Sequence, residues 1–153
     1  MAVFRSSKAT LEPAVVSRGS TTLPQAAQTA YFTVTGRILL TQIVGEVTVV
    51  IETQETILNL IANPTVGADV PLCTGVDMTA DAVGTLYTIT GDVSDAIQVT
   101  TSGAVDADAN FEKPIVVAAG TIDLNSDNDS SSGETKWTLH YIPLDAGSYV
   151  TEA

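Results

Sequence analysis

Short apolar runs with a period of two residues dominate the first half of the chain. In residues 36–62, GRILLTQIVGEVTVVIETQETILNLIA, the side chains of Val47, Val49 and Ile51 alternate with mostly polar neighbours. This period places successive side chains on opposite faces of a strand, and no helical period competes with it. Gly45 and a short polar cluster separate three such runs, so the stretch predicts three adjacent strands in an antiparallel meander.

Similar strand signals recur along the rest of the chain, separated by turn residues such as Pro, Gly, Asn and Asp. The additional predicted strands cover residues 29–35, 70–78, 86–90, 97–101, 114–124, 136–141 and 148–151. We expect the strand at 114–124 to bend or bulge at Gly120, and Pro71 to mark a sheet edge or a strand start. Signals about 8–12 residues apart, without an amphipathic helix, predict an all-β fold: an antiparallel β-sandwich or jelly-roll-like barrel.

A single β-sandwich domain is expected over residues 29–153, preceded by an extended N-terminal arm over residues 1–28, in which residues 14–17 could pair as a short strand. The length of 153 residues suits one domain that folds without disulfides. The lone Cys73 cannot form an intramolecular disulfide, so nothing in the sequence points to an oxidising compartment. No apolar segment reaches the length of a secretory signal or a membrane span, so we expect a soluble protein made in a cytoplasm.

The chain is acidic, with a formal net charge of −12 at pH 7. Such a surface repels nucleic acid and anionic membranes, so neither is an expected partner. The first 18 residues are the exception, because Arg5, Lys8 and Arg18 stand there beside a single acidic residue. We expect this arm to contact an acidic surface, such as the body of another copy; a loose soluble leader is the alternative.

An acidic stretch in the last third of the chain is the strongest local motif for chemistry. Counted from Asp123, oxygen-bearing side chains stand at positions 1, 3, 5, 7, 9 and 12, which is the ligand spacing of an EF-hand calcium loop. The candidate ligands are Asp123, Asn125, Asp127, Asp129 and Glu134. Asn128 stands where such a loop has Gly, and the flanking segments predict strands and not helices. A solvated acidic hairpin turn is therefore the alternative, and we expect no cofactor other than this calcium ion.

Catalytic arrangements find little support in the sequence. His140, the only histidine, lies within an alternating strand pattern, and no GxSxG nucleophile elbow accompanies it. We therefore expect His140 to lie on a strand face and Cys73 to be a small, partly buried side chain. Asp77 and Asp81 could resemble a glycosidase pair, but they stand in predicted turns without aromatic neighbours to stack a sugar.

Aromatic residues make up only 5% of the chain, and Trp137, Tyr141 and Tyr149 are among them. These three could form a carbohydrate-binding platform; the alternative, which we favour, places Trp137 at the centre of the core. Charged residues are also few, at 16%. This composition is more typical of a β-rich structural domain with broad contact surfaces than of an enzyme with a concave polar site.

Four strand-and-turn stretches of the sequence carry a resemblance to a known family. They are GRILLTQIVGEVT (36–48), GTLYTITG (84–91), GTIDLN (120–125) and KWTLHYIPLDAGSYVTEA (136–153). Together they resemble a family of small virion proteins of tailed bacteriophages. The resemblance implies a capsid-decorating or minor structural role, a β-rich fold and a homotrimer on the capsid exterior, with the major capsid protein as partner. It brings no catalytic residue, and the arm before residue 29 lies outside it.

Three functions follow as hypotheses. We prefer a non-enzymatic capsid decoration (cement) protein, made in the host cytoplasm, that binds and stabilises the head shell. Its candidate capsid contacts are Phe4, Arg5, Lys8 and Arg18. The second hypothesis is a receptor- or glycan-binding module of a phage fibre or tail, with an exposed aromatic patch as its site. The third is a hydrolase, which requires His140 beside a Ser or Asp in a pocket.

Overall fold

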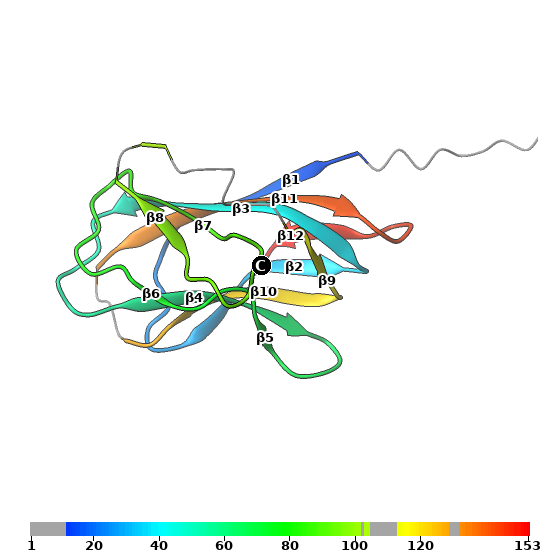
Figure 1. The fold of residues 1–153 in the computed structure, drawn as a ribbon, viewed down its shortest axis with the longest axis horizontal. Coiled ribbons are helices and arrows are strands. Elements are labelled where there is room, and N and C mark those ends of the chain that lie inside the picture. Colours follow the sequence, from blue (N-terminus) through cyan, green and yellow to red (C-terminus); the bar gives the residue numbers. More distant parts are fainter. Residues whose placement is uncertain (1–11, 102, 105–112, 129–131) are drawn as a thin grey trace, which may run out of the picture.

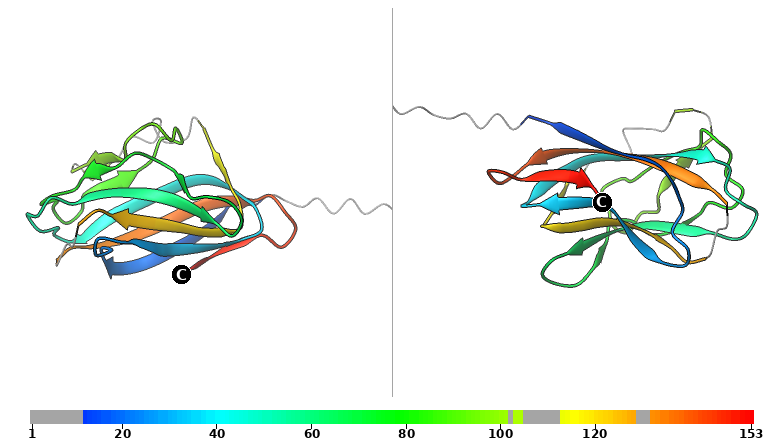
Figure 2. Two further views of the ribbon diagram at one scale, coloured as in Figure 1. Left: turned by 90° about the horizontal axis from the view of Figure 1, so that it is seen from below. Right: turned by 180° about the vertical axis from the view of Figure 1, so that it is seen from behind.

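The computed structural model describes residues 12–101, 103–104, 113–128 and 132–153. In this part of the chain the strands form two facing antiparallel sheets, which confirms the predicted β-sandwich (Figure 1). The two views of Figure 2 show the same layers from below and from behind. None of the described residues lies in a helix.

Each sheet is built mostly from strands that are distant in sequence. The first sheet has the order β1-β11-β3-β7-β8, with β9 also paired to β3. Its strands are β1 (Ala14–Thr22), β3 (Ile38–Val49), β7 (Leu86–Thr88), β8 (Gln98–Thr100), β9 (Ile115–Val117) and β11 (Glu134–Pro143). The second sheet has the order β12-β2-β10-β4-β5, with β6 also paired to β4. Its strands are β2 (Gln28–Thr35), β4 (Ile57–Pro64), β5 (Val70–Pro71), β6 (Val76–Asp77), β10 (Gly120–Ser126) and β12 (Tyr149–Glu152).

The aromatic centre of the core lies on β11. Trp137, Leu139 and Tyr141 are all buried, as their alternating spacing predicts. The Tyr87 ring of β7 stacks on the indole of Trp137, with ring centroids 6.2 Å apart. This arrangement confirms that Trp137 belongs to the core.

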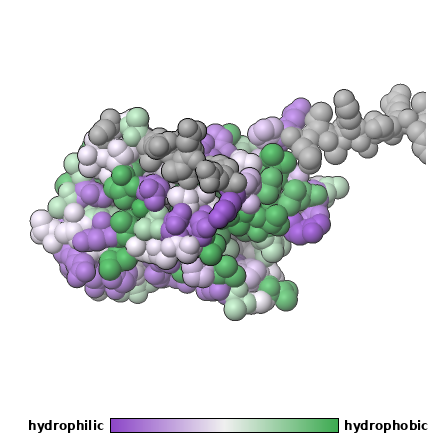
Figure 3. Space-filling model, viewed as in Figure 1, coloured by the Kyte–Doolittle hydropathy of each residue, from purple (hydrophilic) through white to green (hydrophobic). Residues whose placement is uncertain are grey.

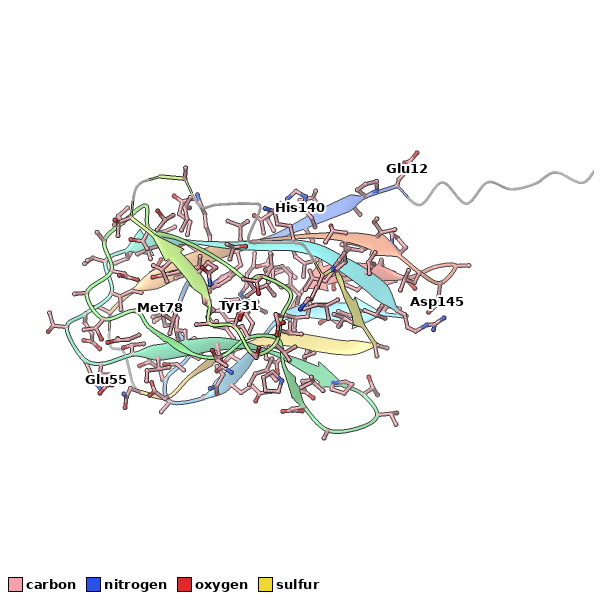
Figure 4. All side chains as sticks on the ribbon, in the orientation of Figure 1. Glu12, Tyr31, Glu55, Met78, His140 and Asp145 are labelled. Atoms are coloured by element: carbon pink, nitrogen blue, oxygen red, sulfur yellow. The ribbon has the colours of Figure 1, made fainter. Side chains whose placement is uncertain are left out.

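A β-bulge in β2 changes which side chains face the core. Tyr31 and Phe32 are adjacent, yet both are buried, although the sequence pattern predicts opposite faces. The pairing of β2 with β10 skips one residue at Tyr31, and such a bulge lets two successive side chains turn toward the same side. Figure 4 shows that Tyr31 and Met78 both lie between the two sheets.

Gly45 does not end a strand, because β3 runs through it as one strand of 12 residues. It lies opposite Trp137 of β11, and a Cβ atom on Gly45 would stand 2.7 Å from two atoms of the Trp137 ring. The residue is therefore small to make room for the indole and not to turn the chain. Since β4 pairs in the second sheet, the predicted meander of three adjacent strands is wrong.

The predicted strand at residues 114–124 also divides between the sheets. β9 pairs with β3 in the first sheet, whereas β10 pairs with β2 and β4 in the second. Gly120 begins β10 with a φ of +153°, and a Cβ atom there would overlap the carbonyl oxygen of Asn63. The bend predicted at Gly120 is thus a crossing between layers, and the prediction of a single strand is wrong.

The predicted N-terminal arm is too long, because β1 belongs to the sandwich. β1 pairs along β11 and forms an edge of the first sheet. The Arg18 guanidinium lies 4.4 Å from the centroid of the Tyr31 ring and donates to the carbonyl oxygens of Tyr31 and Ala153. Arg18 therefore links the first sheet to the second, which corrects its assignment to a free arm.

The other candidate capsid contacts, Phe4, Arg5 and Lys8, lie outside the described residues. A deletion that tests the arm has to end before β1, since a longer one would remove part of a sheet.

Two local predictions are confirmed. Pro71 lies in β5, at an edge of the second sheet, where its missing N–H removes no ladder hydrogen bond. The predicted strands at residues 86–90 and 97–101 are present as β7 and β8, which pair as an antiparallel hairpin.

Candidate functional site

The four predicted calcium ligands that the structure describes do not lie in one loop. Asp123 and Asn125 are alternate residues of β10 on the outer face of the second sheet, whereas Glu134 begins β11 in the first sheet. Asp127 Oδ1 accepts the first backbone N–H of β4 at 2.8 Å, and Asp129 lies outside the described residues. The spacing at 123 and 125 is that of a strand, in which every second residue shares a face, and not that of an EF-hand loop.

His140 and Cys73 occupy different parts of the sandwich. His140 lies on the outer side of β11, between Val15 and Gln42 of the neighbouring strands (Figure 4). Cys73 is buried, and its Sγ accepts the backbone N–H of Leu60 at 3.3 Å. The structure confirms that His140 is a strand-face residue and does not bring it together with Cys73.

We expect the Cys73 thiol to be unreactive in the folded protein. Burial raises its pKa from 9.0 to about 11, so the nucleophilic thiolate is a minor species at about pH 8. Ellman's reagent should therefore modify Cys73 only after the protein unfolds in guanidinium chloride. Rapid modification of the native protein would contradict this prediction.

Asp77 and Asp81 support the loop that precedes β7. Hydrogen bonds from the hydroxyl and N–H of Thr79 hold the pKa of Asp77 below its usual value, with the N–H at 2.9 Å from Oδ1. Burial raises the pKa of Asp81, whose Oδ2 accepts the Tyr87 hydroxyl proton at 2.6 Å. Opposite shifts in two carboxylates are a feature of acid–base pairs. Here the shift of Asp77 comes from hydrogen bonds within the loop and the shift of Asp81 comes from burial, so we assign both residues structural roles.

An exposed platform of three aromatic residues is not formed. The buried Trp137 donates its indole N–H to Thr135 Oγ1 at 3.0 Å, and the Tyr141 hydroxyl accepts the Val150 N–H at 3.1 Å. Tyr149 is half-exposed. Of the three predicted platform residues, only Tyr149 is accessible to a ligand.

An apolar hollow opens between the edges of the two sheets, and we call it the valine hollow. Its volume is about 180 Å³, and its lining includes Val70, Leu72, Val93, Ile115, Val116 and Val117. Val70, Val93 and Val116 are 51%, 50% and 59% exposed. In Figure 3, hydrophobic side chains gather on this face over β9 and the adjoining end of β3. Apolar side chains gathered around a hollow, unlike ones scattered singly, indicate an interaction site.

The walls of the valine hollow are held in place by contacts between segments. Lys113 Nζ and Asp92 Oδ2 form a 2.6 Å ion pair, which lowers the pKa of the Asp92 carboxyl and ties the β7–β8 loop to the start of β9. Gly91 packs so closely on the Lys113 carbonyl oxygen that an added Cβ would overlap it. The backbone N–H of Thr65 donates at 2.8 Å to the carbonyl oxygen of Ala119, the residue just before β10. The hollow is thus a preformed feature of the sandwich.

Sequence reasoning misses this hollow because its residues come from separate segments at 62–72, 93 and 115–121. One signal was present: the apolar run that follows Pro114 has no polar alternation. Such a run indicates a strand with apolar surroundings on both faces.

Comparison of the chain with protein-family models, with curated proteins and with solved structures gives no match. In the part of the chain that the structure describes, no three or more His, Cys, Asp or Glu residues group to hold a metal ion. Nor does this part contain a helix long and apolar enough to cross a membrane.

Proposed function

We propose that this protein is a non-enzymatic structural protein of a tailed-bacteriophage virion, a capsid decoration protein that binds the head shell from outside. The observation that carries the proposal is the valine hollow, a preformed apolar concavity with half-exposed valines at its rim. Covering such a surface with a partner removes apolar area from water, at roughly 25 cal/mol per Å². The sequence resemblance to small virion proteins supplies the partner, which is the major capsid protein.

The proposed mechanism is adhesion. An apolar side chain of a shell subunit enters the valine hollow, and the neighbouring strands β5 and β9 extend the contact toward the roughly 800 Å² per partner of a stable interface. Assembly as a homotrimer lets several hollows bind at once, so that modest single contacts together become hard to reverse. The net charge of −12 keeps unbound copies soluble in the host cytoplasm.

The proposal is tested by measuring how much protein co-sediments with assembled head shells of the same phage, with and without one substitution in the valine hollow. Val116→Asp introduces a charge at an exposed position, so the sandwich should fold while the copies that co-sediment with shells fall at least ~10-fold. Val83→Asp is the matched control, since Val83 is 63% exposed. Val116 pairs with Leu39 near the start of β3. The backbone N–H of Gly84, which follows Val83, donates to the carbonyl oxygen of Val47 near the end of β3. The two substituted sites therefore lie at opposite ends of this strand.

The same experiment tests the arm and the alternative function. Removing residues 1–11, which leaves β1 intact, should weaken shell binding without unfolding the body. Wild-type protein that ignores shells, or Val116→Asp protein that binds them normally, would overturn the proposal. Glycan binding through Tyr149 would then be examined, as expected for a fibre or tail module.

A further inference from the structure

We propose that the outer face of the second sheet holds a divalent-cation site of the calcium class, formed by Asp69 and Asp123 with the side-chain amides of Gln28 and Asn63. The proposal does not rest on shell binding, although Asn63 also lines the valine hollow. It shares only Asp123 with the EF-hand spacing in the sequence. Its four residues come from β2, β4, β10 and the β4–β5 loop.

The two carboxylates are close together because they share one donor. Gln28 Nε2 donates to Asp69 Oδ2 at 3.0 Å and to Asp123 Oδ2 at 2.8 Å. Asn63 Nδ2 donates to the same Asp123 oxygen at 3.1 Å. Four oxygen-bearing side chains thus converge on one point of the sheet surface.

The incomplete hydrogen bonding of Asp123 is the observation that indicates a bound ligand. This residue is only 3% exposed, and its Oδ1 is fully buried with no hydrogen-bond partner. A buried carboxylate oxygen without a partner is costly, since ionised groups inside proteins are normally paired or bound to a metal. Two amide N–H groups on the other oxygen do not balance its charge.

Among the described residues, no observed ion pair joins a basic side chain to Asp69 or Asp123; the observed contacts of these side chains are with other residues. The pairs are Arg18 with Tyr31, Arg37 with Asp145, Lys113 with Asp92 and Lys136 with Glu46. Two neighbouring carboxylates without a protein cation form a site of net negative charge, which favours a bound cation.

The two amides can act as ligands as well as donors. Rotating an amide group by 180° exchanges its oxygen and nitrogen, which are assigned from the hydrogen-bond network. In the rotated state Gln28 Oε1 and Asn63 Oδ1 face the carboxylates. Two carboxylates and two amide oxygens are hard ligands of the kind calcium prefers, and water can complete its shell of 6–8 oxygens at the exposed side of Asp69.

Thermal unfolding of the full-length, EDTA-treated protein in a calcium chloride titration tests the site. Calcium binding to the folded state should raise Tm with concentration up to about 10 mM, above the 10⁻⁴–10⁻³ M dissociation constants of weak calcium sites. Sodium chloride of equal ionic strength should not. Asp69→Asn, at an exposed position that keeps an acceptor for Gln28, should weaken calcium binding at least ~10-fold in isothermal titration calorimetry.

Asp127→Asn is the matched control, because its amide oxygen can still accept the β4 N–H and its position belongs only to the EF-hand spacing. This variant should bind calcium like the wild type. The absence of any calcium-specific rise in Tm would overturn the proposal. So would a response that Asp69→Asn leaves intact or that Asp127→Asn abolishes.

Discussion

Gly45→Ala is expected to lower the free energy of unfolding by about 2–3 kcal/mol, a large loss for a domain of this size. The added methyl group would stand 2.7 Å from atoms of the Trp137 ring. β3 cannot shift to relieve the overlap, because it is paired to β11 on one side and to β7 and β9 on the other. Urea unfolding followed by circular dichroism measures the loss.

A double-mutant cycle separates this overlap from other effects of removing a glycine. Trp137→Leu removes the overlapping ring atoms at a cost of about 3 kcal/mol, and in that background Gly45→Ala should be neutral or stabilising. Gly19→Ala on β1 is the control, since nothing lies within 4 Å of its added Cβ; its effect should stay below about 0.5 kcal/mol. Equal losses from Gly45→Ala in both backgrounds would contradict the packing explanation.

Gly120→Ala is expected to cost about 3–5 kcal/mol, the larger of the two effects. A methyl group there would overlap the Asn63 carbonyl oxygen and approach the Pro64 Cα within 2.6 Å. Overpacking against backbone adds roughly 1–3 kcal/mol, and a non-glycine residue at a φ of +153° adds strain of similar size. The variant should unfold at much lower urea concentration than the wild type.

Gly147→Ala provides a reference for the cost of a positive φ without steric overlap. Gly147 has a φ of +80° and nothing within 4 Å of an added Cβ, so its substitution carries strain without overlap. We expect a cost of about 1–2 kcal/mol there. A Gly120→Ala loss no larger than this would show that the crossing between sheets tolerates a side chain.

The alternation of apolar residues predicts strands and their buried faces, but it does not say which sheet a strand joins. The inward spacing of Trp137, Leu139 and Tyr141 was readable, as was the edge position of Pro71. The pairing of β1 with β11, more than 100 residues apart, was not, because a strand's partner is chosen by three-dimensional packing. Gly45 and Gly120 look alike in sequence, yet one accommodates a ring and the other a crossing.

The candidate sites show the same limit. Asp123 was identified from its spacing to other oxygen ligands, but its neighbours Gln28, Asn63 and Asp69 come from other segments of the chain. The valine hollow is likewise assembled from segments that are far apart in sequence. The spacing of residues along the sequence can identify a site formed by a single loop. It cannot identify a site whose residues come from different strands of a sheet.

The passage of the chain from one sheet to the other at Gly120 also affects the rigidity of the valine hollow. β9 lines the hollow and passes directly into β10, so this wall is anchored in both sheets. A wall held from two sides keeps its shape, and a partner that binds it loses little to rearrangement of the protein. For the proposed contact with a shell subunit, we therefore expect a side chain that fits the volume of about 180 Å³ to bind, and a larger one to bind more weakly even when it is more hydrophobic.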